Sequence, residues 1–511
     1  MFSFSAINLG CSKNMVDLEY AIGEILKYSD RAPIEFHDNP ESRDAEYVIV
    51  NTCGFLSSAR QESEETLSYY DSLGKKLILM GCYVSVKDDR FLAGLQNLVS
   101  IVPFMSYSII EELVLGKKSK FNLSAIVNAK KAHKESKEKT LSNYLASIEA
   151  PGKNKKAFVW RGDEVRAYMH APFGYEYLKV AEGCDNNCTF CIIPTIRGRQ
   201  TSRPIEAIVE EVKLMLTQGI REIQILSQDT TRYGTDLYGE PRLIEMLEAV
   251  DRTISEFVIA QSSRHSDEGR IHVSEISGSF MSQDDETVTH SPKFRVYYLY
   301  PDILTLSHLE KLAKLKHFLP YFDIPFQHAS ENILKLMGRH YDRAHIDSFI
   351  EYIRAHFPDS FIRTAFIIGF PGETDTDFET LMDFVERYRF ESVGIFQYHD
   401  EPLAASSKLP NKVDEDIAKS RINTINPLLE KILDEKLAER KWKIQHGYVM
   451  ELRETSIIIR PELAAPEVDD YDEVPLTDIV TQGIGIGSYV EYSLTSGQIQ
   501  GQSEEKNRFA H

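Results

Sequence analysis

The six cysteines fall into two sets of three, and cysteine is the residue type that binds the iron of iron–sulfur clusters. One set is compact, with the spacing Cys-x3-Cys-x2-Cys inside EGCDNNCTFCIIP, and the other is spread over the first 82 residues in NLGCSKN, VNTCGF and LMGCYVS. Thiolates are the ligands that select iron–sulfur clusters and zinc. Three thiolates on a four-iron cluster leave one iron open to an exogenous ligand, so both sets predict chemistry at an open iron. The compact set is Cys184, Cys188 and Cys191, and the dispersed set is Cys11, Cys53 and Cys82.

The spacing of the compact set favours an iron–sulfur cluster over zinc. A zinc ribbon needs two pairs of ligands that close a tetrahedron, and no second cysteine pair or histidine pair lies near residues 184–191. Two alternatives stay open. One is a zinc site that takes a distant fourth ligand, and the other is a set of buried thiols, because free cysteine often behaves as a small core residue.

The composition restricts the kind of partner that the protein can bind and the kind of compartment in which we expect it. The chain has 511 residues, with 58 Lys and Arg against 78 Asp and Glu, a net charge of −20. This acidity disfavours an unaided grip on phosphate backbones and favours a basic partner. The N-terminus MFSFSAINLGC does not resemble a signal peptide, and the sequence has no apolar run of 18 residues. Unpaired thiols point to a reducing compartment, and we expect a soluble, cytoplasmic protein without a membrane segment.

The dispersed cysteines share one structural context. Strand-like runs FSAINLG, AEYVIVNTC and KLILMGC each end at one of them, and a polar helix-like segment follows each run. Open parallel sheets gather ligands at the carboxyl ends of their strands. Residues 1–115 are therefore predicted to be an open α/β domain that brings three distant cysteines together. Residues 116–170 are lysine-rich and predict a linker.

Residues 171–411 alternate strand-like and helix-like segments, which predicts parallel βαβ units and a partial (β/α) barrel. Catalytic groups of such barrels follow the carboxyl ends of the strands, and the compact cysteines follow the first strand. The polar stretch 255–292 interrupts the rhythm and is interpreted as an insertion on a surface loop. Residues 412–440 predict a helical connection, and 441–511 predict a small β-barrel. GIGIG, with Gly483, Gly485 and Gly487, precedes a strand and is interpreted as a turn.

Taken in order, the motifs resemble those of the methylthiotransferase family of radical S-adenosylmethionine (radical SAM) enzymes. They are NLGCSKNMVDLE, VNTCGFLSSARQES, MGCY, AEGCDNNCTFCIIPTIRGRQTSRP, ILSQDTTRYG and FIIGFPGET. Within that family, these motifs are most similar to those of the ribosomal-protein aspartate methylthiotransferases. The resemblance covers nearly the whole chain except 116–170 and 255–292, and it implies that the C-terminal β-barrel is a TRAM domain.

The resemblance implies two 4Fe–4S clusters and SAM as cofactors. Cys184, Cys188 and Cys191 would hold the cluster that cleaves SAM to a 5′-deoxyadenosyl radical, and Cys11, Cys53 and Cys82 would hold a second cluster that presents sulfur. The radical would remove hydrogen from the β-carbon of an aspartate in a small-subunit ribosomal protein, expected to be ribosomal protein twelve. Hydrogen abstraction needs no acid–base pair, so we expect no catalytic histidine or carboxylate. Candidate SAM contacts are Gln228 and Asp229 at the end of a strand, Arg363 on a later strand, and Gly369 and Glu373 in the turn of IIGFPGET.

Two other functions stay open. A tRNA adenosine methylthiotransferase would carry the same clusters, but residues 441–511 hold six Lys and Arg against twelve Asp and Glu, an unfavourable footprint for RNA. A non-catalytic electron carrier would gain from four thiolates per cluster and would need no SAM pocket. The expected partners are a basic ribosomal protein and an electron donor such as flavodoxin or ferredoxin, with tRNA disfavoured. The acidic run Glu467, Asp469, Asp470, Asp472 and Glu473 is the predicted docking surface, and a solvated loop is its alternative.

Overall fold

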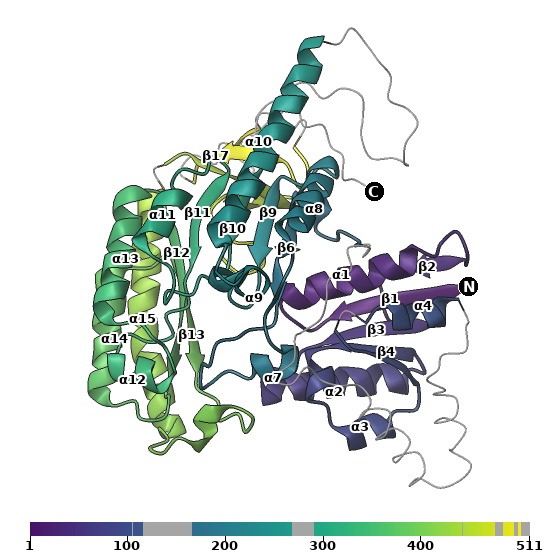
Figure 1. The fold of residues 1–511 in the computed structure, drawn as a ribbon, viewed down its shortest axis with the longest axis horizontal. Coiled ribbons are helices and arrows are strands. Elements are labelled where there is room, and N and C mark those ends of the chain that lie inside the picture. Colours follow the sequence, from purple (N-terminus) through teal and green to yellow (C-terminus); the bar gives the residue numbers. More distant parts are fainter. Residues whose placement is uncertain are drawn as a thin grey trace. The chain divides into compact units, whose positions relative to one another are not determined.

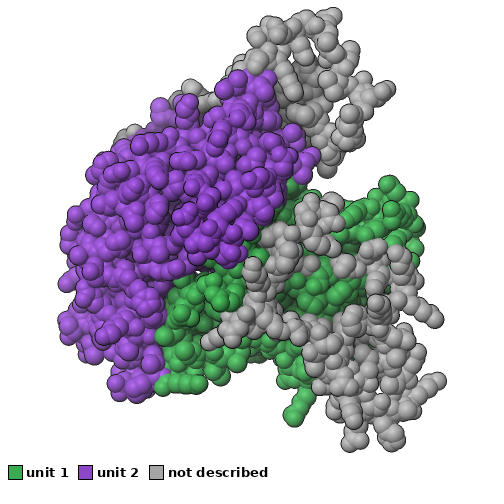
Figure 2. Space-filling view, viewed as in Figure 1, with its two compact units in different colours: residues 1–168, 179–203, 399–408 green, residues 169–178, 204–398, 409–511 purple. Residues whose placement is uncertain are grey.

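The computed structural model describes residues 1–104, 106–115, 166–267, 291–441, 443–475, 484–494 and 499–501. It divides into two compact units, coloured separately in Figure 2. The first contains 1–168, 179–203 and 399–408, and the second contains 169–178, 204–398 and 409–511. Most of the predicted linker, the central part of the predicted insertion, and Gly483 lie outside the described residues.

The first unit is built on a five-stranded parallel sheet in the order β2-β1-β3-β4-β5. Figure 1 shows α1 along one face of this sheet and α2 along the other. Val48, Val50, Leu77 and Leu79, at alternate positions of the two central strands, are buried in one core cluster. The open α/β domain predicted from the sequence is confirmed. Its elements are β1 (Phe2–Asn8), α1 (Ser12–Leu26), β2 (Ile34–Phe36), β3 (Tyr47–Thr52), α2 (Ser57–Ser72), β4 (Lys76–Gly81), α3 (Asp89–Gly94), β5 (Leu98–Val102) and α4 (Ser108–Val114).

A short segment that follows β6 completes the first unit. It contains a two-stranded antiparallel pair that brackets the compact cysteines and a one-turn helix. Residues 399–408 pack against it, since the Ser406 amide donates to the carbonyl oxygen of Thr189 at 2.8 Å. Both cysteine sets therefore lie in one compact unit. The elements are β7 (Ala181–Glu182), α7 (Ile193–Arg197) and β8 (Thr201–Ser202).

The second unit contains a six-stranded sheet in the order β13-β12-β11-β10-β9-β6, with parallel pairing from β9 to β13. Figure 1 shows α13, α14 and α15 along the outer face of its later strands. This arrangement confirms the predicted partial barrel of alternating strands and helices. The elements are β6 (Tyr175–Lys179), α8 (Ile205–Thr217), β9 (Glu222–Leu226), α9 (Thr235–Tyr238), α10 (Leu243–Asp267), β10 (Lys293–Val296), α11 (Leu306–Leu312), β11 (Phe318–Asp323), α12 (Glu331–Leu336), α13 (Arg343–His356), β12 (Phe361–Ile368), α14 (Asp375–Tyr388) and β13 (Ser392–Gln397).

The prediction that residues 255–292 form an inserted surface loop is wrong for the first part of this range. Helix α10 runs to Asp267 without a break, so residues 255–267 are helical. Ile254 is fully buried, and Val250 lies buried one turn before it. The apolar face that begins inside α10 carries the helix into a polar stretch because a nucleated helix extends at little cost through residues of moderate propensity. Residues 268–290 lie outside the described residues.

The chain ends in a five-stranded antiparallel sheet that follows a long helix, α15 (Glu415–Arg440). Val449, Ile457, Ile459 and Val490 form its core, as expected of a small β-domain with alternating inward residues. Gly487 has φ +82° in the turn that enters β17, which fits the predicted turn at GIGIG. The strands are β14 (Gln445–Leu452), β15 (Ser456–Pro461), β16 (Asp472–Pro475), β17 (Tyr489–Tyr492) and β18 (Ile499–Gly501), in the order β16-β15-β14-β17-β18.

A buried charge triad joins this terminal sheet to the barrel within the second unit. Glu222 opens β9, and its carboxylate accepts from Arg295 Nη2 at 2.8 Å and from Arg460 Nη2 at 2.7 Å. All three side chains have no exposed surface. Arg295 also donates to the carbonyl oxygens of Glu462 and Leu463. The two guanidinium groups lower the pKa of Glu222 against the opposing effect of burial.

Replacing Glu222 with glutamine is expected to destabilise the second unit by about 3–5 kcal/mol, because two buried guanidinium groups would lose their shared counter-charge. The matched control is Glu210→Gln on α8, where the carboxylate is 72% exposed and pairs only with Lys213. Thermal unfolding should show a clear loss of Tm for E222Q and almost none for E210Q. Equal melting of the two variants would contradict the structural role of the triad.

Candidate functional site

The dispersed cysteines meet at one edge of the N-terminal sheet. Cys11 is the N-cap residue of α1, Cys53 directly follows β3, and Cys82 directly follows β4. The register pairs Thr52 with Gly81, which sets Cys53 and Cys82 side by side at the carboxyl ends of adjacent strands. The Asn14 side chain links Cys11 to Cys82, because its Oδ1 lies 3.6 Å from the Sγ atoms of both cysteines.

Glycines make this approach of the loops possible. A Cβ on Gly54 would lie 2.8 Å from the carbonyl carbon and oxygen of Cys82. Gly81 has φ +95°, and a Cβ there would lie 2.4 Å from the carbonyl oxygen of Thr52. Both positions therefore need glycine, since any larger residue would push the Cys53 and Cys82 loops apart.

The donor set at this edge fits an iron–sulfur cluster. Burial raises the pKa of Cys82 to about 11 and also raises the pKa of Cys53. Burial acts the same way on Cys11, but the cations Lys13 and Arg197 outweigh it and lower that pKa. A single zinc ion with Zn–S bonds of about 2.3 Å needs its sulfurs within ~4 Å of one another. Among the described residues, no three cysteine sulfurs all lie within 4.8 Å of one another, which disfavours a single zinc ion held by three of these thiolates as they lie.

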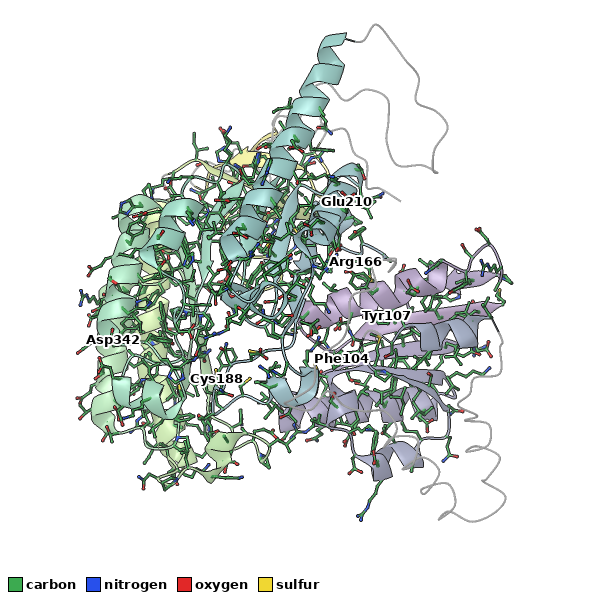
Figure 3. The ribbon with its side chains drawn as sticks, in the orientation of Figure 1. Phe104, Tyr107, Arg166, Cys188, Glu210 and Asp342 are labelled. Atoms are coloured by element: carbon green, nitrogen blue, oxygen red, sulfur yellow. The ribbon has the colours of Figure 1, made fainter. Side chains whose placement is uncertain are left out.

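The compact cysteines lie on the loop between β7 and α7. Cys188 is labelled in Figure 3. Two backbone amides point at thiol sulfurs: Asn186 N lies 3.5 Å from Cys184 Sγ, and Ile193 N lies 3.4 Å from Cys191 Sγ. Donors of this kind stabilise thiolates that bind metal. Cys184 is buried, whereas Cys188 and Cys191 are partly exposed, so the set has an accessible side.

Sequence reasoning missed the residue that connects the two sets. Arg197 ends α7, the helix that follows Cys191, and its guanidinium reaches Cys82 Sγ of the other set at 3.3 and 3.4 Å. Ile192 and Ile196 of the same segment pack with Cys82 in one apolar cluster. The sequence carried no signal for this contact, since Arg197 and Cys82 are 115 positions apart.

The candidate SAM contacts lie in the second unit. Gln228 and Asp229 follow β9, and Gly369 and Glu373 follow β12, so these four lie at the carboxyl edge of the sheet. The same edge holds two residues other than glycine with positive φ, Tyr298 at +57° and Gln327 at +70°. Strained backbone of this kind gathers at functional sites.

Arg363 is the third residue of β12, and the register places it beside Asp323, the last residue of β11. Its guanidinium donates to Asp323 at 3.0 Å and lies 3.9 Å from Asp469, and these carboxylates raise its pKa against the opposing effect of burial. The structure thus gives Arg363 two carboxylate neighbours, and its contact with SAM stays a prediction.

Two of the four edge residues have side chains with structural tasks. The Glu373 carboxylate accepts from the backbone amides of Gly369 and Phe370 and pairs with Arg421 at 3.1 Å, which closes the GFPGE turn. The Asp229 carboxylate accepts from the Thr231 amide at 3.0 Å and caps the next turn. Gly369 has φ +82°, and a Cβ there would lie 2.6 Å from the Cβ of Ala418 on α15, so the close approach of that helix is itself a reason for glycine.

The acidic run has buried and exposed members, and its role as a docking surface stays a prediction. Asp469 and Asp472 are at most 9% exposed, whereas Glu467, Asp470 and Glu473 are exposed. Glu467 accepts from Tyr175 and Tyr177, each at 3.1 Å. Asp469 is nearly buried and accepts from Tyr321 at 2.8 Å. The remaining pairs are Asp472 with Arg440 and Glu473 with Arg453. The sequence could not show these contacts, because the tyrosine and arginine partners are distant in sequence.

His328 is a core histidine that follows β11. It has no exposed surface, its Nδ1 accepts from the Ser330 amide at 3.0 Å, and its Nε2 has no hydrogen-bond partner among the described residues. Burial lowers its pKa to about 4, although Asp377 acts in the opposite direction.

Acidification is expected to loosen the region around His328. The unfolded chain takes up a proton below pH 6.5 while the folded chain stays neutral until about pH 4, so stability falls as pH drops, by roughly 2 kcal/mol between pH 6.5 and 5. His328→Asn keeps an acceptor for Ser330 and removes the titration. Hydrogen exchange of residues 324–336 should accelerate on acidification more in the wild type than in H328N, compared at each pH. Identical responses would contradict this assignment.

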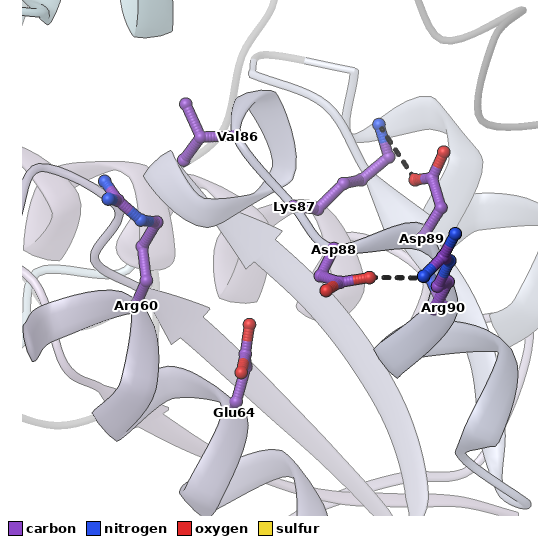
Figure 4. A pocket seen from close by; sticks show the side chains of 7 residues that line it. All are labelled: Arg60, Glu64, Val86, Lys87, Asp88, Asp89 and Arg90. Carbon is purple, nitrogen blue, oxygen red and sulfur yellow. Dashed lines mark hydrogen bonds and ion pairs between the residues drawn. The ribbon is translucent and has the colours of Figure 1, made fainter. Parts of the chain in front are cut away.

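A cavity of about 580 Å³ opens beside the N-terminal sheet, between α2 and the loop that leads into α3. Figure 4 shows its lining, which is mostly charged and contains none of the predicted site residues. Arg60 on its wall donates to the Gly54 carbonyl oxygen at 3.1 Å, so the cavity borders the Cys53 loop. The other lining residues are Glu64, Val86, Lys87, Asp88, Asp89 and Arg90.

Comparisons with known proteins follow the two-part architecture. The family described as the Radical SAM superfamily matches residues 178–385, and the uncharacterized protein family UPF0004 matches residues 3–102. The ribosomal protein uS12 methylthiotransferase RimO of Clostridioides difficile is 32% identical over 97% of this chain and 98% of its own length. The protein of the same description from Gloeothece citriformis is 33% identical over 83% of this chain and 81% of its own.

One solved structure similar to this chain is the radical SAM methyltransferase TsrM of Kitasatospora setae with cobalamin and a [4Fe-4S] cluster bound. It is 13% identical and has a TM-score of 0.48, covering 79% of this chain and 77% of that chain. Within the described ranges, no helix combines the length and apolar character needed to cross a bilayer.

Proposed function

This chain belongs to the RimO family of ribosomal protein uS12 methylthiotransferases, and from that premise we propose that it methylthiolates the β-carbon of an aspartate side chain in uS12. The chain is a radical SAM methylthiotransferase and therefore uses SAM and a 4Fe–4S cluster. The observation that carries the proposal is the pairing of two cysteine triads in one compact unit, one compact and one gathered from three strand ends.

Each triad has a separate task in this proposal. Cys184, Cys188 and Cys191 hold the cluster that binds SAM at an open iron, and their partly exposed side is where SAM enters. Cys11, Cys53 and Cys82 hold a second 4Fe–4S cluster. When bound, the SAM cluster supplies a carbon radical that can remove a hydrogen atom from an unactivated carbon. The protein residues hold and orient the reactants, and none needs to act as an acid or base.

SAM contacts come from the carboxyl edge of the barrel. We assign Gln228, Asp229 and the backbone at Gly369 to this task. Asp229 already orients the turn that follows β9, and Gly369 presents backbone in a conformation that favours glycine. Glu373 contributes by holding that backbone in place through its two amide contacts.

Charge supports a basic protein as the substrate. The chain has a net charge of −20, and residues 441–511 contribute −6. Binding to the phosphates of tRNA needs clustered Lys and Arg side chains. An acidic protein instead attracts a basic ribosomal protein and so increases the rate of association. We further propose a cytoplasmic location and a small redox protein, flavodoxin or ferredoxin, as the electron donor.

The test offers purified uS12, alone and in the small subunit, beside bulk tRNA to the reconstituted enzyme with SAM and a reductant. Mass spectrometry should find one methylthio group on one aspartate of uS12 and none on tRNA adenosine. Incorporation into tRNA with none into uS12 would overturn the proposal in favour of the tRNA enzyme.

A further inference from the structure

Among the described residues, only Arg197 contacts Cys82 Sγ through two side-chain nitrogen atoms. Its Nε is 3.4 Å and its Nη2 3.3 Å from that sulfur. Nη2 also donates to Asn14 Oδ1 at 2.6 Å, and this oxygen lies 3.6 Å from the Sγ of Cys11. One guanidinium therefore serves two of the three dispersed cysteines, one directly and one through Asn14.

The guanidinium is held in place from its other side. Nη1 donates to Asp17 at 2.9 Å and to Glu182 at 2.8 Å, and the Phe104 ring, labelled in Figure 3, lies 4.3 Å from the guanidinium carbon. Lys179 pairs with the same two carboxylates. The Arg197, Lys179, Asp17 and Glu182 side chains are each at most 1% exposed.

The charges of this group balance without the cysteines. Two cations face two carboxylates, so the group as a whole is neutral before any thiolate forms. Burying such a network is costly unless each member keeps its partners. The Nε and Nη2 donors on the sulfur side are therefore left for Cys82 and Asn14, in a fixed orientation set by Asp17 and Glu182. A lysine at this position could satisfy the carboxylates but could not present a planar fork to the sulfur.

We propose that Arg197 is a positioning residue for the N-terminal cluster, which orients the Cys82 thiolate and raises the reduction potential of the cluster that Cys82 helps to hold. The inference rests on the proposed assignment of Cys11, Cys53 and Cys82 as cluster ligands. Hydrogen bonds to ligand sulfurs stabilise the more negative, reduced state and so shift the potential upward. The cation itself acts in the same direction at short range, because solvent is excluded.

A consequence is that α7, the helix that follows the compact triad, carries a residue that affects the cluster held by the dispersed triad. Arg197 follows Cys191 by six positions and lies at the end of the helix that begins two residues after it. The SAM-binding loop and the second cluster are thus joined by one side chain inside one compact unit. Removing that side chain should change the second cluster while leaving the first set of ligands intact.

The experiment isolates the N-terminal cluster in a protein with Cys184, Cys188 and Cys191 replaced by alanine. Into this background go Arg197→Lys, Arg197→Gln and, as the matched control, Arg199→Lys, whose side chain is 53% exposed and pairs only with Asp185. Iron content, redox titration followed by electron paramagnetic resonance, and the rate of iron loss to a chelator are measured on each protein.

The expected result is a more negative midpoint potential for R197Q, a smaller shift for R197K and none for R199K. Iron retention should fall roughly tenfold in R197Q, at the lower end of the cost of losing a partner of a metal ligand. R197K keeps a charge for Asp17 and Glu182, so it serves if R197Q does not fold. Potentials and iron-loss rates equal to those of R199K would overturn the role of Arg197. A background protein that binds no iron would instead overturn the cluster assignment, and this role with it.

Discussion

Replacing Cys184, Cys188 and Cys191 with alanine is expected to abolish SAM cleavage while about half of the iron remains. The reconstituted wild type should hold about eight irons, four for each triad, and the variant about four. The reason is that, in the proposed function, SAM binds at the iron that the compact triad leaves open. Without that cluster no electron reaches SAM, so production of 5′-deoxyadenosine should fall to the background of the reductant alone. Iron analysis and chromatography of the products check both parts.

The other triad supplies the matched control for this prediction. Its three thiols lie in the same unit and are the only other cysteines of the chain, so the two sets of variants differ in which cluster is lost and not in how many thiols are removed. Zinc at stoichiometric amounts with no iron, after anaerobic purification of the wild type, would refute the cluster assignment for both triads.

The architecture could be predicted because its signals are local. Strand-like runs that end at Cys11, Cys53 and Cys82 gave a parallel sheet, and the structure has β1, β3 and β4 side by side. The alternation of strands and helices gave the partial barrel in the same way. Periodicity needs only neighbours in sequence, and the rule that ligands gather at carboxyl ends of parallel strands converts it into a place in space.

What could not be predicted depends on partners far apart in sequence. Glu222 meets Arg460 across 238 positions, and Arg197 meets Cys82 across 115. The acidic run shows the same limit from the other side, because Asp469 looks solvated in sequence yet accepts from Tyr321. The extent of α10 was missed for a different reason, since its last turns are polar and depend on the apolar turns before them.

Changing Cys53 to alanine is expected to leave SAM cleavage and remove methylthio transfer. Cys53 is the best single position for this test, because Cys82 carries the Arg197 contacts and its loss would also disturb the helix that follows the SAM-binding loop. A C53A protein should make 5′-deoxyadenosine at a rate close to that of the wild type and yield no methylthiolated uS12.

The two activities should separate because, in the proposed function, hydrogen abstraction needs only the compact triad, whereas the N-terminal cluster presents the transferred sulfur. C82A should show the same loss of transfer together with slower SAM cleavage, and that difference between two ligands of one cluster would locate the coupling at Arg197. Methylthiolated product from C53A, at a level above that of a protein lacking all three dispersed cysteines, would show that the N-terminal triad is not the source of the sulfur.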